Sequence, residues 1–197
     1  MSADLLRGER VRLVAMDAEA HAGHLARWSA DSEYLRLQAS DPARPFSVAQ
    51  TKVELEKLLE SEDDFFFLIY TLADDRPIGT VELDGIVWAH GEAWLGIGLG
   101  ERTLWGRGYG TDAMRVILRL AFEELNLHRV TLNVFEYNTR ALRIYGRLGF
   151  RVEGRVRQAL LREGRRWDLI FMGLLRSEWE AEDACRWRMP MNGGSIR

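Results

Sequence analysis

Hydrophobic and polar positions along the 197 residues change period several times, and each period predicts a different element. Residues 9–15 alternate polar and apolar side chains, which is typical of a strand with one buried face. Met114, Ile117, Ala121 and Leu125 recur at helical spacing and indicate a helix with one apolar face. Taken along the whole chain, these patterns predict strands over 9–15, 65–73, 78–86, 93–100, 129–135, 150–160 and 165–175, and helices over 17–28, 31–37, 47–60, 110–125 and 138–149.

Short polar residues stand where several of these helices begin. Their side chains can accept hydrogen bonds from the first free N–H groups of a helix. The residues in question are Asp17, Asp31, Ser47 and Asn138. Gly149 follows the last periodic residue of its helix, where a glycine commonly ends a helix. The tail 177–197 starts as a helix and ends in a Pro- and Gly-rich piece that we expect to be disordered and flexible.

The order of elements is β-α-α-α-β-β-β-α-β-α-β-β, which predicts one layered α/β (α+β) domain over residues 8–176. The strand over 93–100, the helix over 110–125 and the strand over 129–135 form a βαβ unit with parallel strands. In such a sheet, ligands lie beyond the carboxyl ends of the strands, at the loop that enters the helix. Here that loop is "WGRGYGT", residues 105–111.

Composition excludes some classes of function. A formal net charge of −3 gives no reason to expect a nucleic-acid partner. Cys185 is the single cysteine, so neither an intrachain disulfide nor a Cys-based metal site is expected, and the four histidines show no metal-ligand spacing. No apolar run approaches the roughly 18–20 residues of a membrane span, and the N-terminus lacks the apolar core of a signal peptide. We therefore expect a cytoplasmic protein that binds no metal and no membrane.

The glycine loop suits a phosphate group. The N-terminus of a helix presents N–H groups without partners and the positive end of the helix dipole. Gly108 and Gly110 let the backbone approach an anion closely because they lack a Cβ, and Arg107 can add a donor. The loop lacks the Gly-Lys-Ser/Thr of the NTPase loop, and Thr111 stands where the dinucleotide fingerprint needs its third glycine. The plainer alternative is a tight turn between strand and helix.

The segment 96–150 resembles the core of the GCN5-related N-acetyltransferases, the GNAT superfamily, and more closely the branch of the ribosomal-protein alanine N-acetyltransferases. "WGRGYGT" resembles the pyrophosphate loop of that family, although Trp105 departs from its Gln/Arg position. "NTRALRIYGRLGF" (138–150) resembles the second family motif, an Asn followed seven residues later by Tyr and then Leu-Gly-Phe. With the N-terminal "GERVRLVAMDAEA" and the last hairpin, the likeness covers about residues 8–175.

The resemblance implies the GNAT acyl-CoA N-acyltransferase fold: a mixed, mostly antiparallel sheet with a splayed central parallel strand pair and helices on both faces. It implies acetyl-CoA as co-substrate and a primary amine as acceptor, with direct attack in a ternary complex. In that family a bulged strand supplies a backbone N–H to the thioester carbonyl, which places this donor near Ile97, Gly98 or Leu99, and the glycine loop holds the pyrophosphate. The glycine run 96–100 fits a bulge or a close backbone approach. The cofactor-binding residues expected on this basis are Ile97, Gly98, Leu99, Arg107, Gly108, Tyr109, Gly110, Thr111, Asn133, Asn138 and Tyr145.

Two catalytic roles are expected. Asn138 and Tyr145 share one helix face about 10 Å apart along the axis, and the phenol is the candidate acid for the leaving thiolate. The alternatives are a plain N-cap for Asn138 and core packing for Tyr145. The amine needs a base, for which the candidate carboxylates are Glu82, Asp84 and Glu136; we favour Glu82. Some family members carry a glutamate where this chain has Trp94, so that base is missing.

Several alternatives stay open. The acceptor is a protein N-terminus or a small amine, and its site is expected from segments 20–45 and 76–92. A longer acyl-CoA, such as succinyl-CoA, is an alternative donor. A non-catalytic acyl-CoA-binding regulatory module is an alternative function, although the presence of Tyr145 and of the glycines favours an enzyme. Homodimers are common in the branch that the chain resembles, so a homodimer is a further expectation.

Overall fold

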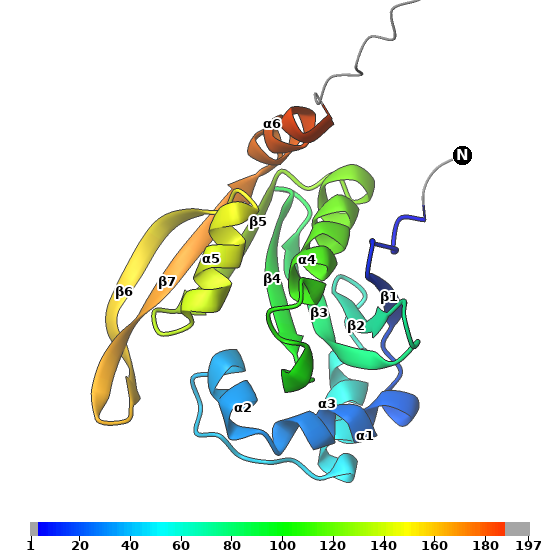
Figure 1. The fold of residues 1–197 in the computed structure, drawn as a ribbon, viewed down its shortest axis with the longest axis vertical. Coiled ribbons are helices and arrows are strands. Elements are labelled where there is room, and N and C mark those ends of the chain that lie inside the picture. Colours follow the sequence, from blue (N-terminus) through cyan, green and yellow to red (C-terminus); the bar gives the residue numbers. More distant parts are fainter. Residues whose placement is uncertain (1–3, 188–197) are drawn as a thin grey trace, which may run out of the picture.

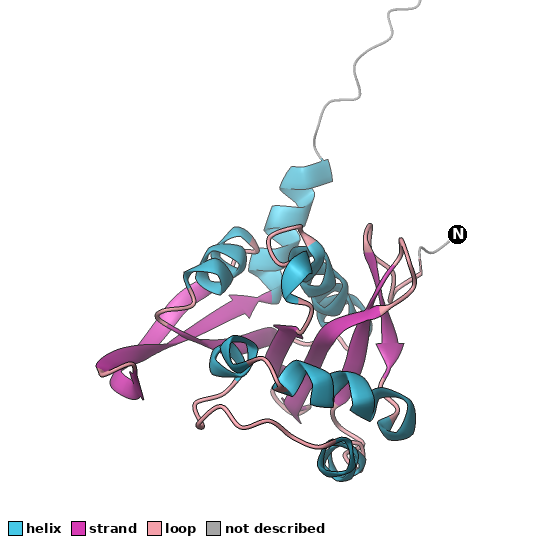
Figure 2. Cartoon of the chain, turned by 60° about the horizontal axis from the view of Figure 1, so that its bottom comes forward, coloured by secondary structure: helices cyan, strands magenta, loops and turns pink. Residues whose placement is uncertain are grey.

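The computed structural model describes residues 4–187, which form one seven-stranded sheet in the order β1-β2-β3-β4-β5-β7-β6 with helices on both faces (Figures 1 and 2). The strands are β1 (Val11–Ala15), β2 (Phe65–Thr71), β3 (Pro77–Val87), β4 (Glu92–Leu99), β5 (Arg129–Phe135), β6 (Arg151–Arg162) and β7 (Arg165–Leu175). The helices are α1 (Ala18–Ser29), α2 (Ser32–Gln38), α3 (Val48–Leu58), α4 (Tyr109–Arg119), α5 (Thr139–Arg147) and α6 (Arg176–Trp187).

The predicted caps explain where four helices begin. In α1, α2, α3 and α5 a side-chain oxygen accepts a hydrogen bond from a free N–H group of the first turn; the capping residues are Asp17, Asp31, Ser47 and Asn138. Gly149 ends α5 with φ +93°, and the Phe150 N–H donates to the Tyr145 carbonyl at 3.1 Å, as in a Schellman motif. These boundaries confirm the sequence prediction. The Pro- and Gly-rich end of the tail lies outside the described residues.

One predicted helix is wrong in its second half. The helix expected over 110–125 divides into α4 and a π-helical turn, η2 (Leu120–Glu124). The Leu125 N–H reaches back five residues to the Leu120 carbonyl at 3.0 Å, which widens the turn. The apolar side chains of this stretch still face the core, so their spacing along the sequence gave no sign of the change. A short 3-10 turn, η1 (Arg102–Leu104), was not expected either.

The splay of the central strands is confirmed. β4 and β5 are the parallel pair, and every other neighbouring pair in the sheet is antiparallel. Pairing joins Glu92–Trp94 of β4 to Arg129–Thr131 of β5 and stops there. Both strands continue, to Leu99 and Phe135, so one edge of β4 is open over its carboxyl half. The glycine loop and α4 follow directly after this open edge (Figure 1).

Of the two expectations for the glycine run 96–100, a bulge or a close backbone approach, the structure has the second. β3 and β4 pair without a shift along segment 79–84 of β3, and the register shifts only beyond it. The glycines instead allow a close approach of two backbones, because a Cβ placed at Gly79 would lie 2.1 Å from the Gly98 carbonyl oxygen. The open edge of β4 is therefore the edge of a regular strand that has no paired strand beside it.

Helices on the two faces have different tasks. α4 packs against β1, β3 and β4, and its apolar face carries much of the core. The buried Asp112 carboxylate in its first turn accepts the N–H groups of Glu9, Arg10 and Val11 at 2.7–3.2 Å, which fixes β1 beside the glycine loop. α1, α2 and α3 lie on the opposite face (Figure 2). No helix in the described part of the chain has the length and apolar character needed to cross a membrane.

Candidate active site

A cleft of about 1890 Å³ lies where β4 and β5 separate. It is bounded by α2 on one side and by the start of α4 and one face of α5 on the other. Most residues predicted from the sequence line it: Glu82, Ile97, Leu99, Gly108, Gly110, Thr111, Asn133, Asn138 and Tyr145. Trp94 and Trp105 line it as well. Gly98, Arg107 and Tyr109 are not part of this lining.

The glycine loop leaves backbone donors free at the start of α4. Gly108 is the N-cap residue, with φ +89°, a conformation that strains any residue with a Cβ. No side chain caps this helix. The first intrahelical bond is donated by Asp112 to the Gly108 carbonyl at 3.0 Å, so the N–H groups of Tyr109, Gly110 and Thr111 precede it. This geometry suits an anion.

Two residues of the loop differ in detail from the expectation. The Arg107 N–H donates to the Leu104 carbonyl at 3.4 Å, so this amide is already engaged, while the side chain is exposed. The Tyr109 side chain packs against the core. Arg107 is therefore placed to contribute its guanidinium, and Tyr109 its backbone N–H.

The open edge of β4 carries backbone groups of alternate residues. The Trp105 indole donates to the Leu99 carbonyl at 2.7 Å, and the Gln38 amide donates to the Ile97 carbonyl at 3.2 Å. Ile97 and Leu99 thus point their backbone groups away from β3. Because these groups alternate along a strand, Gly98 points its own toward β3. Of the three donors proposed here, Ile97 and Leu99 have the suitable direction.

The second family motif, residues 138–150, lies on the α5 side of the cleft. The Asn138 side chain accepts the Ala141 N–H at 3.2 Å, so the N-cap role considered for it is real. Tyr145 lies further along α5 against Phe150, with ring centroids 6.0 Å apart. Burial raises the pKa of the Tyr145 phenol to about 12. The phenol is protonated at neutral pH, as it would be at its ordinary pKa, and burial makes it a weaker acid than an exposed tyrosine. Asn133 is exposed on β5 and also faces the cleft.

The three candidate carboxylates differ in their surroundings. Burial, followed by the charges of Asp84 and Asp64, raises the pKa of Glu82 to about 7. Burial also raises the pKa of Asp84, with Asp64 as the second cause. Glu136 instead pairs with Arg155 at 3.1 Å and accepts the Asp168 N–H at 3.3 Å. Glu82 is the carboxylate of the three whose environment suits a base at neutral pH.

Gly96 explains why Glu82 can lie where it does. These two residues pair across β3 and β4, and a Cβ at Gly96 would lie 2.3 Å from the Glu82 Oε1. The carboxylate therefore occupies the space that a side chain at residue 96 would fill. In the sequence Gly96 suggested a bulge or a close backbone approach, and its neighbour Glu82 on the adjacent strand is visible only in the fold.

Two further residues of the cleft, both on α2, were missed by sequence reasoning. Tyr34 lies near Glu82; burial raises the pKa of its phenol to about 12, against the opposing effect of a hydrogen bond with Thr80. Gln38 holds the Ile97 carbonyl. Nothing in the sequence of this short helix marks either side chain, because their role depends on α2 lying against β4.

Comparisons with known proteins concern the family and the fold of the chain. The family model "Acetyltransferase (GNAT) domain" matches residues 10–151. "Probable N-acetyltransferase YjcK" of Bacillus subtilis is 37% identical over 53% of this chain, but that match covers only 58% of the relative. "Uncharacterized N-acetyltransferase p20" of Bacillus licheniformis is 29% identical over 89% of this chain and 98% of its own length. The uS5-alanine N-acetyltransferase of Escherichia coli is 26% identical over 58% of this chain and 59% of its own length.

A solved structure supports the fold. Spermidine N-acetyltransferase from Vibrio cholerae, in complex with CoA and spermine, superposes with a TM-score of 0.78 at 22% identity over 86% of this chain and 98% of its own. At that identity the likeness concerns the fold. The expected superfamily, its relatives among ribosomal-protein acetyltransferases and the expected fold are confirmed, as is the enzyme class at the level of the family. The chain belongs to the GNAT family of acetyltransferases.

Proposed function

We propose that this chain transfers the acetyl group of acetyl-CoA to a primary amine, on a protein N-terminus or a small molecule, by direct attack in a ternary complex. One observation carries the proposal. A single cleft contains a helix N-terminus with free amides, an open strand edge and a partly buried carboxylate whose pKa is about 7. Those are the features needed to bind a diphosphate, to hold a thioester and to deprotonate an amine.

The amides of Tyr109, Gly110 and Thr111 are the proposed donors to the diphosphate of CoA. Gly108 lets the chain turn and approach the anion because its left-handed φ and missing Cβ leave the front of the helix clear. The exposed Arg107 guanidinium supplies charge from the side. Asn133 and Asn138 line the same cleft and are proposed to contact the rest of the cofactor.

The open edge of β4 is the proposed place of the pantetheine arm and of the thioester. A backbone N–H of Ile97 or Leu99 would stabilise the negative charge that develops on the carbonyl oxygen during attack. The adjacent Gly98 donates no hydrogen bond in the proposed site and contributes to it by having no side chain. The cofactor and the acceptor would then meet at the splay from opposite faces of the sheet.

Glu82 is the proposed base and Tyr145 the proposed acid. The amine gives a proton to the Glu82 carboxylate and its nitrogen forms a bond with the acetyl carbon. The carbon–sulfur bond then breaks, and the Tyr145 phenol gives its proton to the thiolate. An α-amino group with a pKa near 8 needs only modest help, which a carboxylate with a pKa of about 7 can give.

Asp64 and Asp84 line the cleft beside Glu82. The other carboxylates of the lining, Glu33, Glu54 and Glu163, are paired with Arg102, Lys57 and Arg36. The charge of Asp64 and Asp84 favours acceptors that are cationic in solution, which includes protein N-termini and small amines. A cytoplasmic location and a homodimer remain predictions on the same footing.

Mass spectrometry of acetyl transfer to a panel of N-terminal peptides, polyamines and amino sugars tests this proposal. We expect a mass increase of one acetyl group on a primary amine of at least one acceptor, which disappears without acetyl-CoA. Succinyl-CoA in a parallel series tests the alternative donor. Binding of acetyl-CoA without transfer to any amine would contradict the proposal and favour the regulatory module.

A further inference from the structure

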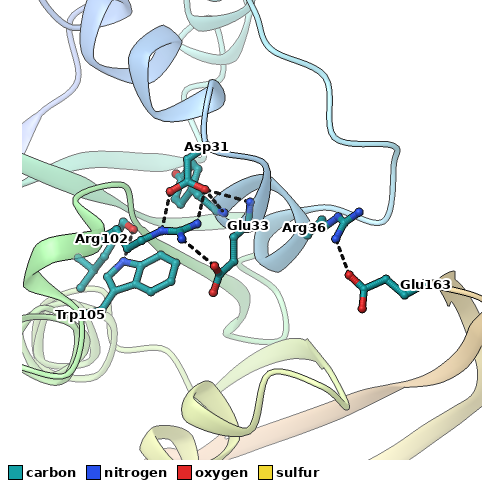
Figure 3. Close-up of polar contacts among 8 residues, drawn as sticks. Asp31, Glu33, Arg36, Arg102, Trp105 and Glu163 are labelled. Carbon is teal, nitrogen blue, oxygen red and sulfur yellow. Dashed lines mark hydrogen bonds and ion pairs between the residues drawn. The ribbon is translucent and has the colours of Figure 1, made fainter.

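α2 lines the cleft, and side-chain contacts join its N-terminal end to the segment that leads into the glycine loop. The Arg102 guanidinium donates to both carboxylate oxygens of Asp31, at 2.9 and 2.5 Å, and pairs with Glu33 at 2.9 Å (Figure 3). The same guanidinium lies 5.5 Å from the centre of the Trp105 ring. The start of α2 is thus joined to the side of the cleft that carries α4.

The other end of α2 is tied to the β6–β7 turn on the far side of the splay. Arg36 pairs with Glu163 at 2.8 Å (Figure 3), and the Tyr137 hydroxyl donates to the Arg36 carbonyl. The guanidinium of Arg162 donates to three successive carbonyl oxygens just after α2, at 2.8–2.9 Å; these belong to Ala39, Ser40 and Asp41. Exposed ion pairs are individually weak, but together these contacts join both ends of α2 to the neighbouring elements.

Gln38, the last residue of α2, stands directly over the open half of β4. A Cβ placed at Gly98 would lie 2.7 Å from both Cδ and Oε1 of Gln38, so the amide fills the space above that glycine. The amide Nε2 also donates to the Ile97 carbonyl at 3.2 Å. Gly98 and Gly96 face the same side of β4 because they are two residues apart, and Glu82 lies over Gly96. Gln38 therefore lies on the face of the proposed base.

We infer that Gln38 sets the length of the acyl group that the enzyme accepts. This inference rests on the proposed function, which places the thioester at the open edge beside Ile97 and Leu99. An acetyl group adds a single methyl beyond the carbonyl carbon. Each further methylene has to enter the space over Gly98, which the Gln38 amide occupies and where its hydrogen bond to the Ile97 carbonyl holds it. The contacts at both ends of α2 fix the backbone that carries Gln38. Arg162 and Glu163 act through Gln38 as positioning residues.

Calorimetry with free CoA, acetyl-CoA and butyryl-CoA tests the inference without knowledge of the acceptor. The wild type should bind acetyl-CoA at least roughly ten-fold more tightly than butyryl-CoA, since two methylenes must displace the amide. Gln38→Ala should remove most of that difference and leave the Kd of free CoA unchanged. Arg162→Ala should reduce it in part. Ser32→Ala, an exposed change at the other end of α2, is the control and should keep the wild-type ratio.

The outcomes separate the two proposals. If the wild type binds none of the three ligands, the proposed function fails and this inference fails with it. If all three bind and Gln38→Ala keeps the wild-type preference for acetyl-CoA, the inference alone is overturned. A Gln38→Ala variant that loses affinity for free CoA also overturns it, because Gln38 would then support the site as a whole and not the acyl group.

Discussion

Glu82 illustrates how a neighbour determines the chemistry of a single residue. Its position two residues from Asp84 on β3 would suit a solvated strand residue equally well. The carboxylate instead lies over Gly96, partly buried, with Asp84 and Asp64 as negative neighbours. Burial and these two charges oppose its ionisation and raise its pKa to about 7.

We expect Glu82→Gln to change the pH dependence of turnover. In the wild type, kcat/KM should fall below pH 7 as Glu82 becomes protonated, in addition to the fall caused by protonation of the amine itself. The variant should be slower and should lose the inflection near pH 7 while keeping that of the amine. Glu54→Gln, which also removes a carboxylate from the cleft lining, is the control and should retain both. An unchanged profile in Glu82→Gln would exclude the base.

The same substitution should stabilise the protein at high pH. Glu82 has a pKa of about 7 in the folded chain against an ordinary 4.5, so the folded state holds its proton more tightly than the unfolded state. Its contribution to stability is full below about pH 4.5 and is lost as the pH rises through 7. Above pH 7 the raised pKa of Glu82 lowers the free energy of unfolding by about 3 kcal/mol relative to its value below pH 4.5. Thermal unfolding should show a higher Tm for Glu82→Gln at pH 8 and little difference at pH 4; equal effects at both would contradict this.

Tyr145→Phe should slow the reaction and leave binding intact. The phenol is proposed to give its proton to the leaving thiolate, and loss of a general acid typically costs on the order of 10²-fold in rate. Calorimetry should return the wild-type Kd for acetyl-CoA, because the ring still packs against Phe150. Tyr70→Phe on β2, outside the cleft lining, serves as the control. A variant with unaltered kcat would leave Tyr145 as a packing residue.

At the scale of elements, the start of α4 decides where the cofactor is proposed to lie. Gly108→Asp should weaken CoA binding severely, because a carboxylate would stand at the position proposed for the diphosphate. Gly164→Asp in the β6–β7 turn is a matched control: its φ of +72° imposes similar backbone strain, and no atom lies within 4 Å of its added Cβ. Calorimetry should show lost affinity in the first variant alone. Similar affinities in both would remove the loop from the site.

Local patterns predicted the elements that depend on local causes. Capping by Asp31 or Ser47 and termination by Gly149 involve residues a few positions apart, so the sequence contains them. The π-helical turn at Leu120–Glu124 keeps the same residues buried, so periodicity does not distinguish it from an α-helix. The roles of Gly96 and Gly98 depend on Glu82 and Gln38, which are distant in sequence, and only the packing of α2 and β3 reveals them.

At the scale of the whole molecule, the sheet opens between β4 and β5, and α2 bridges the opening. Loss of pairing after Trp94 separates the strands β1–β4 from the strands β5–β7 at one end. Arg102 and Arg162 tie α2 to the two sides of that gap. The family motifs predicted the gap through the resemblance. They contain no residue of α2, so the way the gap is bridged was not predictable from them.

A crystal structure of this chain with acetyl-CoA would test the central claim most directly. The account predicts the diphosphate within hydrogen-bond distance of the N–H groups of Tyr109, Gly110 and Thr111, and the pantetheine arm between β4 and β5 with its thioester beside Ile97 or Leu99. A cofactor bound on another surface, or a splay closed by side chains with the cofactor outside it, would contradict the account.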